Sequence, residues 1–564
     1  MEEPETVSGG NQKSQAPLTV TVLAFMTPLK NSINNLDTVE SFVDTPPASP
    51  DSFTKLLPEV LDGPLTFVEA AAQPETLVLP FTPYIYGGVA SLTTFAYGFN
   101  AGIISVAISA VEKAWNLQKT SYALTFIVTA MLAGAVLGSF LPGWIGSDRI
   151  GRKSMIIITN FILISGALGS FLSRNPFQLI AARTVIGLGI GTGSIMPGLY
   201  ITEMSPSSIR GFLGILNQFS GFVGIISSYC VGLIVSEAHW QEMFLLAGSM
   251  AVVALIFSAL ILPESPRWLI SHGYTDEAMA VLNKIYGRHN GHHSNDEFQK
   301  IYAHLSRTKQ ETKSTLPRPI LLKIVALQLI QQAAGSGFVT YYSSSIFRSW
   351  GLDTKASTLA TVLSALPQLF VFVAVAKWAD SLGRRRLLLI SEAVMGFVLF
   401  YLSAVTMFVK HEEGAIVHWQ AGLVFIGLAA HRVAYALGLA PVPTVLIAEI
   451  LPFSLRSHGL AIALTLNWLL NFLITSAIPL ITTMISLSWV YFGMAVFSLA
   501  AFFYISRNIK ETRGAQLEAN EEMHMFPVMP ADPESRMAAF TSVHIDSKPL
   551  EPPRVYPNHH EKTL

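Results

Sequence analysis

The chain has 564 residues, of which 51% are hydrophobic and 13% are charged, and its formal net charge is −1. Soluble domains carry about 25% charged residues, so this composition indicates a protein that lies in a membrane. The near-zero net charge provides no bulk field that would attract nucleic acid, and we expect no nucleic-acid partner. The single cysteine, Cys230, excludes an intrachain disulfide framework.

Residues 1–80 are polar and rich in scattered Pro, Ser, Thr and Gly, which is typical of a disordered tail. Twelve apolar runs follow, each near the ~20 residues that a bilayer core requires. Because lipid offers no partner to an open backbone, runs of this length must be helices. The predicted spans are 84–109, 121–145, 154–173, 177–200, 212–235, 241–262, 319–347, 356–379, 386–409, 419–447, 459–484 and 488–505.

Lysine and arginine are unequally distributed between the turns. Alternate turns, starting with 146–153, hold 17 of these residues, whereas the opposite turns hold six. The positive-inside rule therefore predicts that the first set of turns and both tails are cytoplasmic. The longest turn, 263–318, is expected to form short amphipathic helices on the cytoplasmic face, with Ser265 as an N-cap and Pro266 as the first helical residue.

Two charged signatures occur twice. Gly146–Lys153 corresponds to Ala379–Arg386, and Glu203, Pro206 and Arg210 are each 246 residues before Glu449, Pro452 and Arg456. The chain therefore contains an internal repeat. Many secondary transporters consist of repeated bundles with a binding site between them. The predicted divisions are a tail 1–80, a bundle 81–262, a linker 263–318, a bundle 319–505 and a tail 506–564.

These motifs resemble those of the sugar porter family of the major facilitator superfamily. The resemblance runs from Tyr84 to Glu518 and includes, in order, Gly146–Lys153, Arg183 with Gly187, Gly189 and Gly191, Glu203–Arg210, Pro263–Arg267, Gln331-Gln332, Tyr341–Ser343, Asp380–Arg386, Pro441–Pro443, Glu449–Arg456 and Glu511–Gly514. It implies an all-α integral membrane protein with twelve transmembrane helices in two six-helix bundles. It also implies transport of sugars or polyols by alternating access.

Charged residues at the cytoplasmic ends of helices from both halves can pair across the gap between the bundles. Such pairs would hold the inner mouth closed, and exposed pairs worth about 0–1 kcal/mol each would break readily. The resemblance assigns this role to Arg152, Glu203, Arg210, Glu264, Arg267, Arg384, Glu449 and Arg456. The alternative for Arg149, Lys153, Arg385 and Arg386 is that they only set topology, which is the interpretation we favour.

Amide side chains inside the spans are the candidate sugar ligands, because an amide both donates and accepts hydrogen bonds, as sugar hydroxyls do. The candidates are Gln218, Gln331, Gln332, Asn467 and Asn471, with Trp468 beside them. All five amides match positions that the family uses for sugar. The alternative is that they join helices, at about 0.6 kcal/mol per bond; for Gln332 the two readings are balanced.

Breaks are expected in two spans. Pro441 and Pro443 remove two backbone donors from the tenth span, and Gly335 and Gly337 weaken the seventh. Broken helices at the membrane midplane suit a binding site and a gate. By resemblance, Tyr341 and Tyr342 close the site from outside.

The chain departs from the family at Gly337 in place of an Asn, Thr444 in place of a Trp, and Ala436 in place of a Glu. Where proton-coupled members carry an Asp in the first span, this chain has Asn100, which cannot ionise. Uniport is therefore favoured over proton symport. Glucose as the substrate is placed in doubt.

His431 and Arg432 are unusual because both lie inside the tenth apolar run. They either bind a carboxylate-bearing substrate or a proton, or lie near the outer interface; the second alternative is slightly favoured.

The leading hypothesis is a monomeric plasma-membrane transporter of a small polyhydroxylated solute. The alternatives are a proton-coupled symporter of a sugar or a hydroxylated carboxylate, and a sugar sensor that does not transport. The sequence has no P-loop, metal-spaced His/Cys cluster or nucleophile elbow, so we expect neither an enzyme nor a cofactor.

Overall fold

The computed structural model describes residues 80–117, 122–142, 147–287, 291–310, 316–408, 418–451 and 455–511. Every regular element in these ranges is a helix. The first group comprises α5 (Thr82–Ala114), α6 (Tyr122–Leu141), α7 (Ser147–Ile150), α8 (Arg152–Phe171), α9 (Pro176–Gly193), α10 (Met196–Met204), α11 (Ser207–Ile234), η3 (Glu237–His239) and α12 (Trp240–Ile261).

Three helices form the middle loop, and a second group follows them. The loop helices are α13 (Pro266–Ser271), α14 (Thr275–Tyr286) and α15 (Gly291–Gln310). The second group comprises α16 (Arg318–Ala333), α17 (Ser336–Ser349), α18 (Thr354–Leu382), α19 (Arg384–Phe408), α20 (His418–Ala434), the π-helix η5 (Tyr435–Leu439), α21 (Val442–Ile450), α22 (Arg456–Ile481) and α23 (Leu487–Asn508).

The prediction of twelve spans is confirmed, because twelve stretches within the described ranges are long and apolar enough to cross a membrane. Six precede the loop helices and six follow them. Most ends lie within a few residues of the predicted ones. The first span is longer than predicted: it was expected at 84–109, whereas α5 covers Thr82–Ala114. The predicted tail 1–80, apart from Pro80, and the tail after Glu511 lie outside the described residues.

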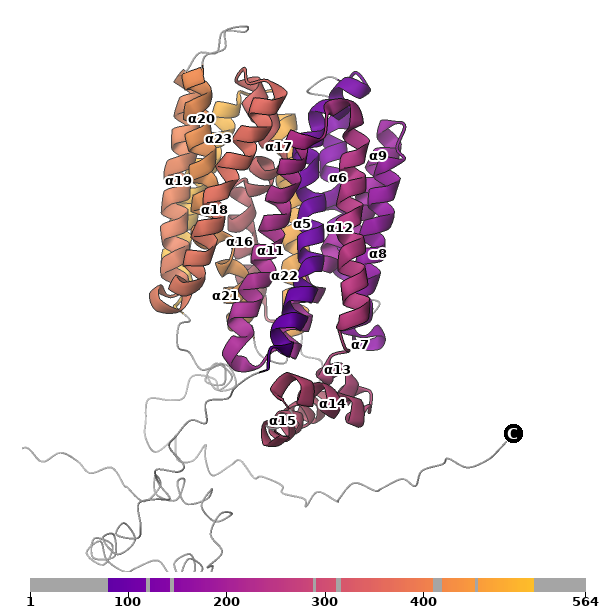
Figure 1. Ribbon diagram of the computed structural model, residues 1–564. Coiled ribbons are helices and arrows are strands. Elements are labelled where there is room, and N and C mark those ends of the chain that lie inside the picture. Colours follow the sequence, from indigo (N-terminus) through magenta and orange to yellow (C-terminus); the bar gives the residue numbers. More distant parts are fainter. Residues whose placement is uncertain are drawn as a thin grey trace, which may run out of the picture. The chain divides into compact units, whose positions relative to one another are not determined.

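The two groups of spans stand side by side, with the loop helices together at one end (Figure 1). We call this end the loop-helix end and the opposite one the far end. Between the groups, α6 packs against α22 and α11 packs against α18. The Phe222 and Phe372 rings, 5.2 Å apart, and the Ser139 and Thr465 hydroxyls, 2.9 Å apart, are two of these contacts.

Polar and apolar side chains are distributed as lipid requires. Large apolar side chains such as Leu260 and Phe397 are exposed on the outside, at 80% and 74% of their surface. Polar residues such as Asn100, Asn160 and Gln328 are buried inside. A surface of this kind would be unfavourable in water, so the arrangement supports an integral, multi-pass membrane protein.

Glycine sets the distance between α6 and α9. A Cβ atom on Gly187 would lie 2.1 Å from the carbonyl oxygen of Met131, so no larger residue fits there. Close backbone approach at small residues is the usual way in which membrane helices associate. The same contact brings Arg183 of α9 against α6, where its Nε donates to the Ile127 carbonyl at 2.7 Å.

The expected start of the first loop helix is confirmed. The Ser265 hydroxyl accepts a hydrogen bond from the backbone N–H of Trp268 at 3.4 Å, and Pro266 is the first residue of α13. The Trp268 ring stacks on His272, with 4.2 Å between the ring centres. These contacts stabilise the two ends of α13.

Candidate functional site

Three amide side chains meet between α16 and α22. Asn467 Nδ2 lies 2.7 Å from both Gln328 Oε1 and Gln331 Oε1, so one amide group donates to two acceptors. We call Gln328, Gln331 and Asn467 the amide cluster. Gln331 and Asn467 were predicted, whereas Gln328 was missed, although it lies one helical turn before Gln331 on the same face. Gln328 is buried, and its Nε2 has no hydrogen-bond partner among the described residues.

The amide cluster lies against the break in the tenth span. Pro443 has no N–H, so the carbonyl of Leu439, four residues earlier, lacks its helical partner. Gln331 Nε2 donates to this carbonyl at 2.8 Å and to that of Ala440 at 3.3 Å. The predicted break is therefore present as η5 and the turn at Pro441, and a side chain of the seventh span satisfies it.

The seventh span is broken where predicted, but one of the two glycines has another role. Gly335 adopts the left-handed conformation, with φ +76°, between α16 and α17. Gly337 lies inside α17, and a Cβ atom there would lie 2.3 Å from Asn471 Oδ1. Gly337 therefore provides the room that Asn471 occupies, rather than breaking the helix.

The other predicted ligands are arranged around the amide cluster without joining it. Trp468 Nε1 donates to the Ser194 hydroxyl of the first group at 3.1 Å, and Asn471 Oδ1 accepts from Thr475 at 2.9 Å. Gln218 is half-buried on α11 and Gln332 is buried on α16. Among the described residues, neither of the last two side chains is hydrogen-bonded to the amide cluster. Their role as ligands stays a prediction.

The fourth span carries a break that sequence reasoning missed. It divides into α9 and α10 at Ser194 and Ile195, with Pro197 in the first turn of α10. Pro197 precedes Pro443 by 246 residues, the same offset that relates Glu203 to Glu449. The repeat could therefore have predicted this break. The breaks of the fourth and tenth spans both lie beside the amide cluster, since Ser194 bonds to Trp468 and the Leu439 carbonyl bonds to Gln331.

Tyr341 and Tyr342 are both buried on α17. The Tyr342 ring lies 5.2 Å from that of Phe338, and its hydroxyl has no partner among the described residues. At the residue before Tyr341, Tyr229 of α11 donates its hydroxyl proton to the Thr340 carbonyl at 2.8 Å. The first and second groups are thus in contact on the far-end side of the amide cluster.

An ion pair joins the two groups near the far end. Arg348 Nη2 of α17 lies 3.3 Å from Glu112 Oε2 of α5, and their side chains are 15% and 14% exposed. Lys113, the next residue of α5, pairs with Glu237 of η3 at 2.5 Å. Sequence reasoning used Lys113 and Arg348 only to orient the chain and missed this contact. We name Glu112–Arg348 the far-end pair.

Loss of the far-end pair is expected to favour opening at the far end. In the variant Glu112→Gln the shift should be about fivefold, corresponding to the ~1 kcal/mol of a partly exposed pair. Labelling of Ser344→Cys, a position buried in α17, from the far side would report it after replacement of Cys230. The charge-swapped variant Glu112→Arg/Arg348→Glu is the control and should restore slow labelling. Equal labelling in all variants would contradict a role in gating.

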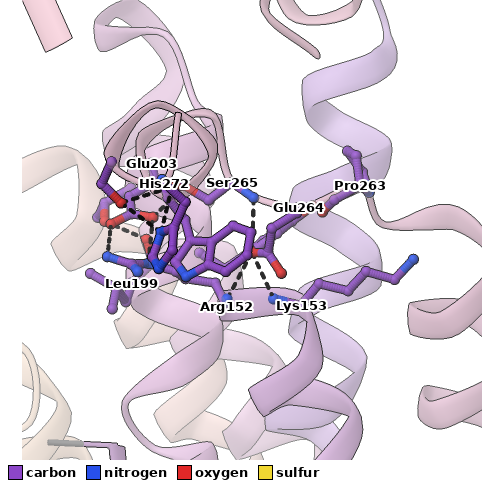
Figure 2. A network of polar contacts seen from close by, with 12 residues as sticks. Arg152, Lys153, Leu199, Glu203, Pro263, Glu264, Ser265 and His272 are labelled. Carbon is purple, nitrogen blue, oxygen red and sulfur yellow. Dashed lines mark hydrogen bonds and ion pairs between the residues drawn. The ribbon is translucent and has the colours of Figure 1, made fainter. Parts of the chain in front are cut away.

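At the loop-helix end, a polar network surrounds the first copy of the charged signature (Figure 2). Arg152 of α8 binds Glu203 of α10 through Nε at 2.9 Å and Nη2 at 3.1 Å. Both side chains are nearly buried, at 8% and 6% exposure. The Ser265 hydroxyl also donates to Glu203.

A carboxylate from the sixth span's end caps α8. Glu264 Oε1 accepts from the backbone N–H groups of Arg152 at 2.7 Å and Lys153 at 3.2 Å, where the positive end of the helix dipole favours an anion. Gly151, at φ +97°, leaves the space that Glu264 fills, because a Cβ atom there would lie 2.3 Å from its Oε2.

The second copy repeats this arrangement. Arg384 Nε lies 3.2 Å from Glu449 Oε1, and Glu511 Oε1 accepts from the Arg384 N–H at 2.9 Å. Gly383 has φ +88°, and a Cβ atom on it would meet Glu511. Glu511 was not among the predicted gate residues. Two features of the sequence could have indicated it: Glu511 begins the motif Glu511–Gly514, and it follows the twelfth span as Glu264 follows the sixth.

The two described ion pairs of these residues each lie within one group: Arg152–Glu203 in the first and Arg384–Glu449 in the second. Arg210 donates to the Ser205 carbonyl at 3.1 Å and lies near Tyr286 of α14, whose pKa burial raises to about 12. The Arg456 side chain lies outside the described residues, and Arg267 is half-buried on α13. The role of these residues as a gate stays a prediction.

Comparison with known proteins identifies relatives of the chain. A family model described as "Sugar (and other) transporter" matches residues 88–524. Plastidic glucose transporter 4 of Arabidopsis thaliana is 31% identical over 456 residues, which are 79% of this chain and 80% of that protein. The D-xylose transporter of Levilactobacillus brevis is 28% identical over 439 residues, or 77% and 93%.

Solved structures share the fold. The proton:xylose symporter XylE bound to 6-bromo-6-deoxy-D-glucose matches with a TM-score of 0.66 and 25% identity, over 78% of this chain and 99% of that one. A partially occluded inward-open form of XylE from E. coli matches with a TM-score of 0.67 at 24% identity, over 78% and 100%. These relatives are transporters and not enzymes. The chain therefore belongs to the sugar transporter family and has the major facilitator fold.

Proposed function

We propose that the protein transports a sugar or polyol across a membrane by alternating access. The observation that carries this proposal is the amide cluster beside two broken helices. Its amides are suited to hydroxyl groups, and the unpartnered Gln328 Nε2 leaves one buried donor for a ligand. Trp468, which reaches the first group at Ser194, brings an aromatic face to the same region. The glucose and xylose named for the relatives are the first substrates to test.

Uptake into liposomes containing the purified full chain tests this function. Radiolabelled D-glucose and D-xylose should exchange against the same unlabelled sugar inside, and a panel of unlabelled polyols should compete. A sensor of the same fold would bind these solutes without exchange. Absence of both exchange and binding for the whole panel would refute the proposal.

The proposed orientation places the loop-helix end and both termini in the cytoplasm. The excess of Lys and Arg in the turns at that end supports it. We also propose that the protein acts as a monomer, since Gln331, Asn467 and Ser194 of the candidate site all come from one chain. The plasma membrane is the proposed location. Protease protection of terminal tags in intact cells, with imaging of a fluorescent fusion, tests orientation and location.

We expect uniport without proton coupling. Asn100 cannot ionise, and its Nδ2 is already bound to the carbonyls of Ala96 at 2.9 Å and Ala247 at 3.3 Å. The buried carboxyl group of Glu392 already accepts a hydrogen bond from Ser498 of α23, within the second group. Solute addition to liposomes should therefore leave the external pH unchanged. Alkalinisation that requires the solute and disappears with an uncoupler would show symport.

A further inference from the structure

Arg432 is an arginine enclosed by protein inside a membrane span. Its side chain is on α20 and only 4% exposed, and His431 beside it is 1% exposed. Neighbouring helices therefore enclose both side chains, whereas their predicted place near the outer interface stays a prediction. An ionisable side chain at such a position is unfavourable in a membrane and usually serves a function.

The described partners of the Arg432 guanidinium are all neutral. Nη2 donates to the Ser343 hydroxyl at 2.7 Å and approaches the Val339 carbonyl at 3.4 Å, both on α17. Its carbon lies 5.7 Å from the ring centre of Tyr229. Its Nε has no hydrogen-bond partner, and no carboxylate pairs with it among the described residues. A buried charge of this kind is expected to be paired, so the guanidinium of Arg432 is suited to bind an anionic ligand.

The position of Arg432 is that of a solute-binding group. Tyr229 belongs to α11 of the first group, so Arg432 of the second group lies where the two groups meet. Its neighbour His431 bonds through Nε2 to the Ala334 carbonyl at 2.7 Å, at the break of the seventh span. Gln331 of the amide cluster lies three residues before Ala334. Arg432 and the amide cluster therefore flank the same break.

A second buried arginine approaches from the first group. Arg183 of α9 is fully buried, its Nη1 has no partner among the described residues, and it interacts electrostatically with Tyr341 and Tyr342 of α17. The described partners of Arg183 are the Ile127 carbonyl and the Met131 sulfur, both neutral. The region around α17 is thus positively charged from both sides, which favours a negatively charged solute.

We propose that Arg432 binds the carboxylate of a sugar acid, so that the solutes of this transporter include hydroxylated monocarboxylates such as uronates or aldonates; this rests on the proposed function. The amide cluster would bind the hydroxyls while Arg432 binds the carboxylate. The single negative charge of a carboxylate balances the guanidinium of Arg432. Charge-assisted hydrogen bonds from a guanidinium to a carboxylate are also the stronger kind.

Three related solutes test the proposal. D-xylose is D-glucuronate without its carboxyl group, and D-glucose carries a hydroxymethyl group in that position. Each is tested as a competitor of labelled D-glucose exchange in liposomes containing the full chain, and labelled D-glucuronate uptake is measured directly. D-glucuronate is expected to compete at a concentration at least about tenfold lower than D-xylose, as one charged hydrogen bond allows. Acetate, a carboxylate without hydroxyls, should compete poorly.

Variants then assign the effect to Arg432. Arg432→Gln should raise the inhibitory concentration of D-glucuronate about tenfold or more while changing that of D-xylose less than about twofold. Arg432→Lys should retain part of the preference. Arg174→Gln, which changes an exposed arginine before α9, is the matched control and should behave as the wild type. Gel filtration and melting temperature establish that each variant is folded, and if Arg432→Gln is not, the wild-type solute series and Arg432→Lys decide.

The outcomes separate this inference from the function on which it rests. Exchange of D-glucose without any preference for D-glucuronate would overturn the inference and leave sugar transport intact. Equal weakening of all three solutes in Arg432→Gln would show that Arg432 only supports the fold. If neither these three solutes nor the panel of polyols binds or exchanges in the wild type, the proposed function fails as well.

Discussion

Replacing Glu203 by glutamine is expected to destabilise the protein by about 3–5 kcal/mol, because it leaves the nearly buried Arg152 without its carboxylate. Two bonds to Arg152 would be weakened, and Ser265 would lose a charged acceptor. The melting temperature in detergent should fall clearly. Unfolding of the purified protein by denaturant measures the loss directly.

The second module provides a matched control. In the corresponding pair, Arg384 and Glu449 are 20% and 21% exposed, so solvent screens them more strongly. Glu449→Gln should therefore cost only about 1 kcal/mol. Arg152→Met combined with Glu203→Leu should recover much of the stability, since no buried charge is left alone. Equal losses for Glu203→Gln and Glu449→Gln would show that burial does not set the strength of these pairs.

Asn467→Ala and Gln331→Ala are expected to weaken solute binding severalfold to more than tenfold without loss of folded protein. Each removes a hydrogen bond worth about 0.5–1.5 kcal/mol, and more where a buried partner is left unsatisfied. Removing Asn467 leaves the side-chain oxygens of Gln328 and Gln331 without their donor. Removing Gln331 also frees the carbonyl of Leu439.

The measurement is the apparent KM for sugar exchange, together with binding at equilibrium. Asn508→Ala is the control, because Asn508 is an exposed amide at the end of α23 whose described hydrogen bond stays within its own helix, at the Tyr504 carbonyl. It should leave both quantities unchanged. Normal KM values in Asn467→Ala and Gln331→Ala, at normal protein levels, would remove the amide cluster from the binding site.

The sequence allowed the spans, the break at Pro441 and Pro443 and the break at Gly335 to be predicted, because each depends on local chain chemistry. Length and hydropathy define a membrane helix, and a proline breaks it whatever its neighbours are. Gln331 and Asn467 were found because an amide is conspicuous in an apolar span. Their mutual contact was not predicted, since it depends on how α16 lies against α22.

The missed features depend on packing or on the offset between repeats. Glu112 and Arg348 are 236 residues apart, and nothing in either local sequence links them. Arg152 pairs with Glu203 of the same group. The positions of charged residues in the sequence do not show which group supplies the partner. The burial of Arg432 was not predicted, because the length of an apolar run does not indicate which residues neighbouring helices cover.

The capping of α8 by Glu264 and of α19 by Glu511 has a consequence for how the halves could exist apart. In each half, the carboxylate that follows the sixth span binds the first residue of the third span. The two ends of this part of each half are therefore joined by residues of that half alone. A chain split between α14 and α15 would leave Glu264 with the first half and Glu511 with the second. Two such fragments, produced together, would each keep the cap of their own third span, and we expect them to assemble as a non-covalent pair through contacts such as α6–α22. A split before residue 263 would place Glu264 in the second fragment, so α8 in the first fragment would lose its cap.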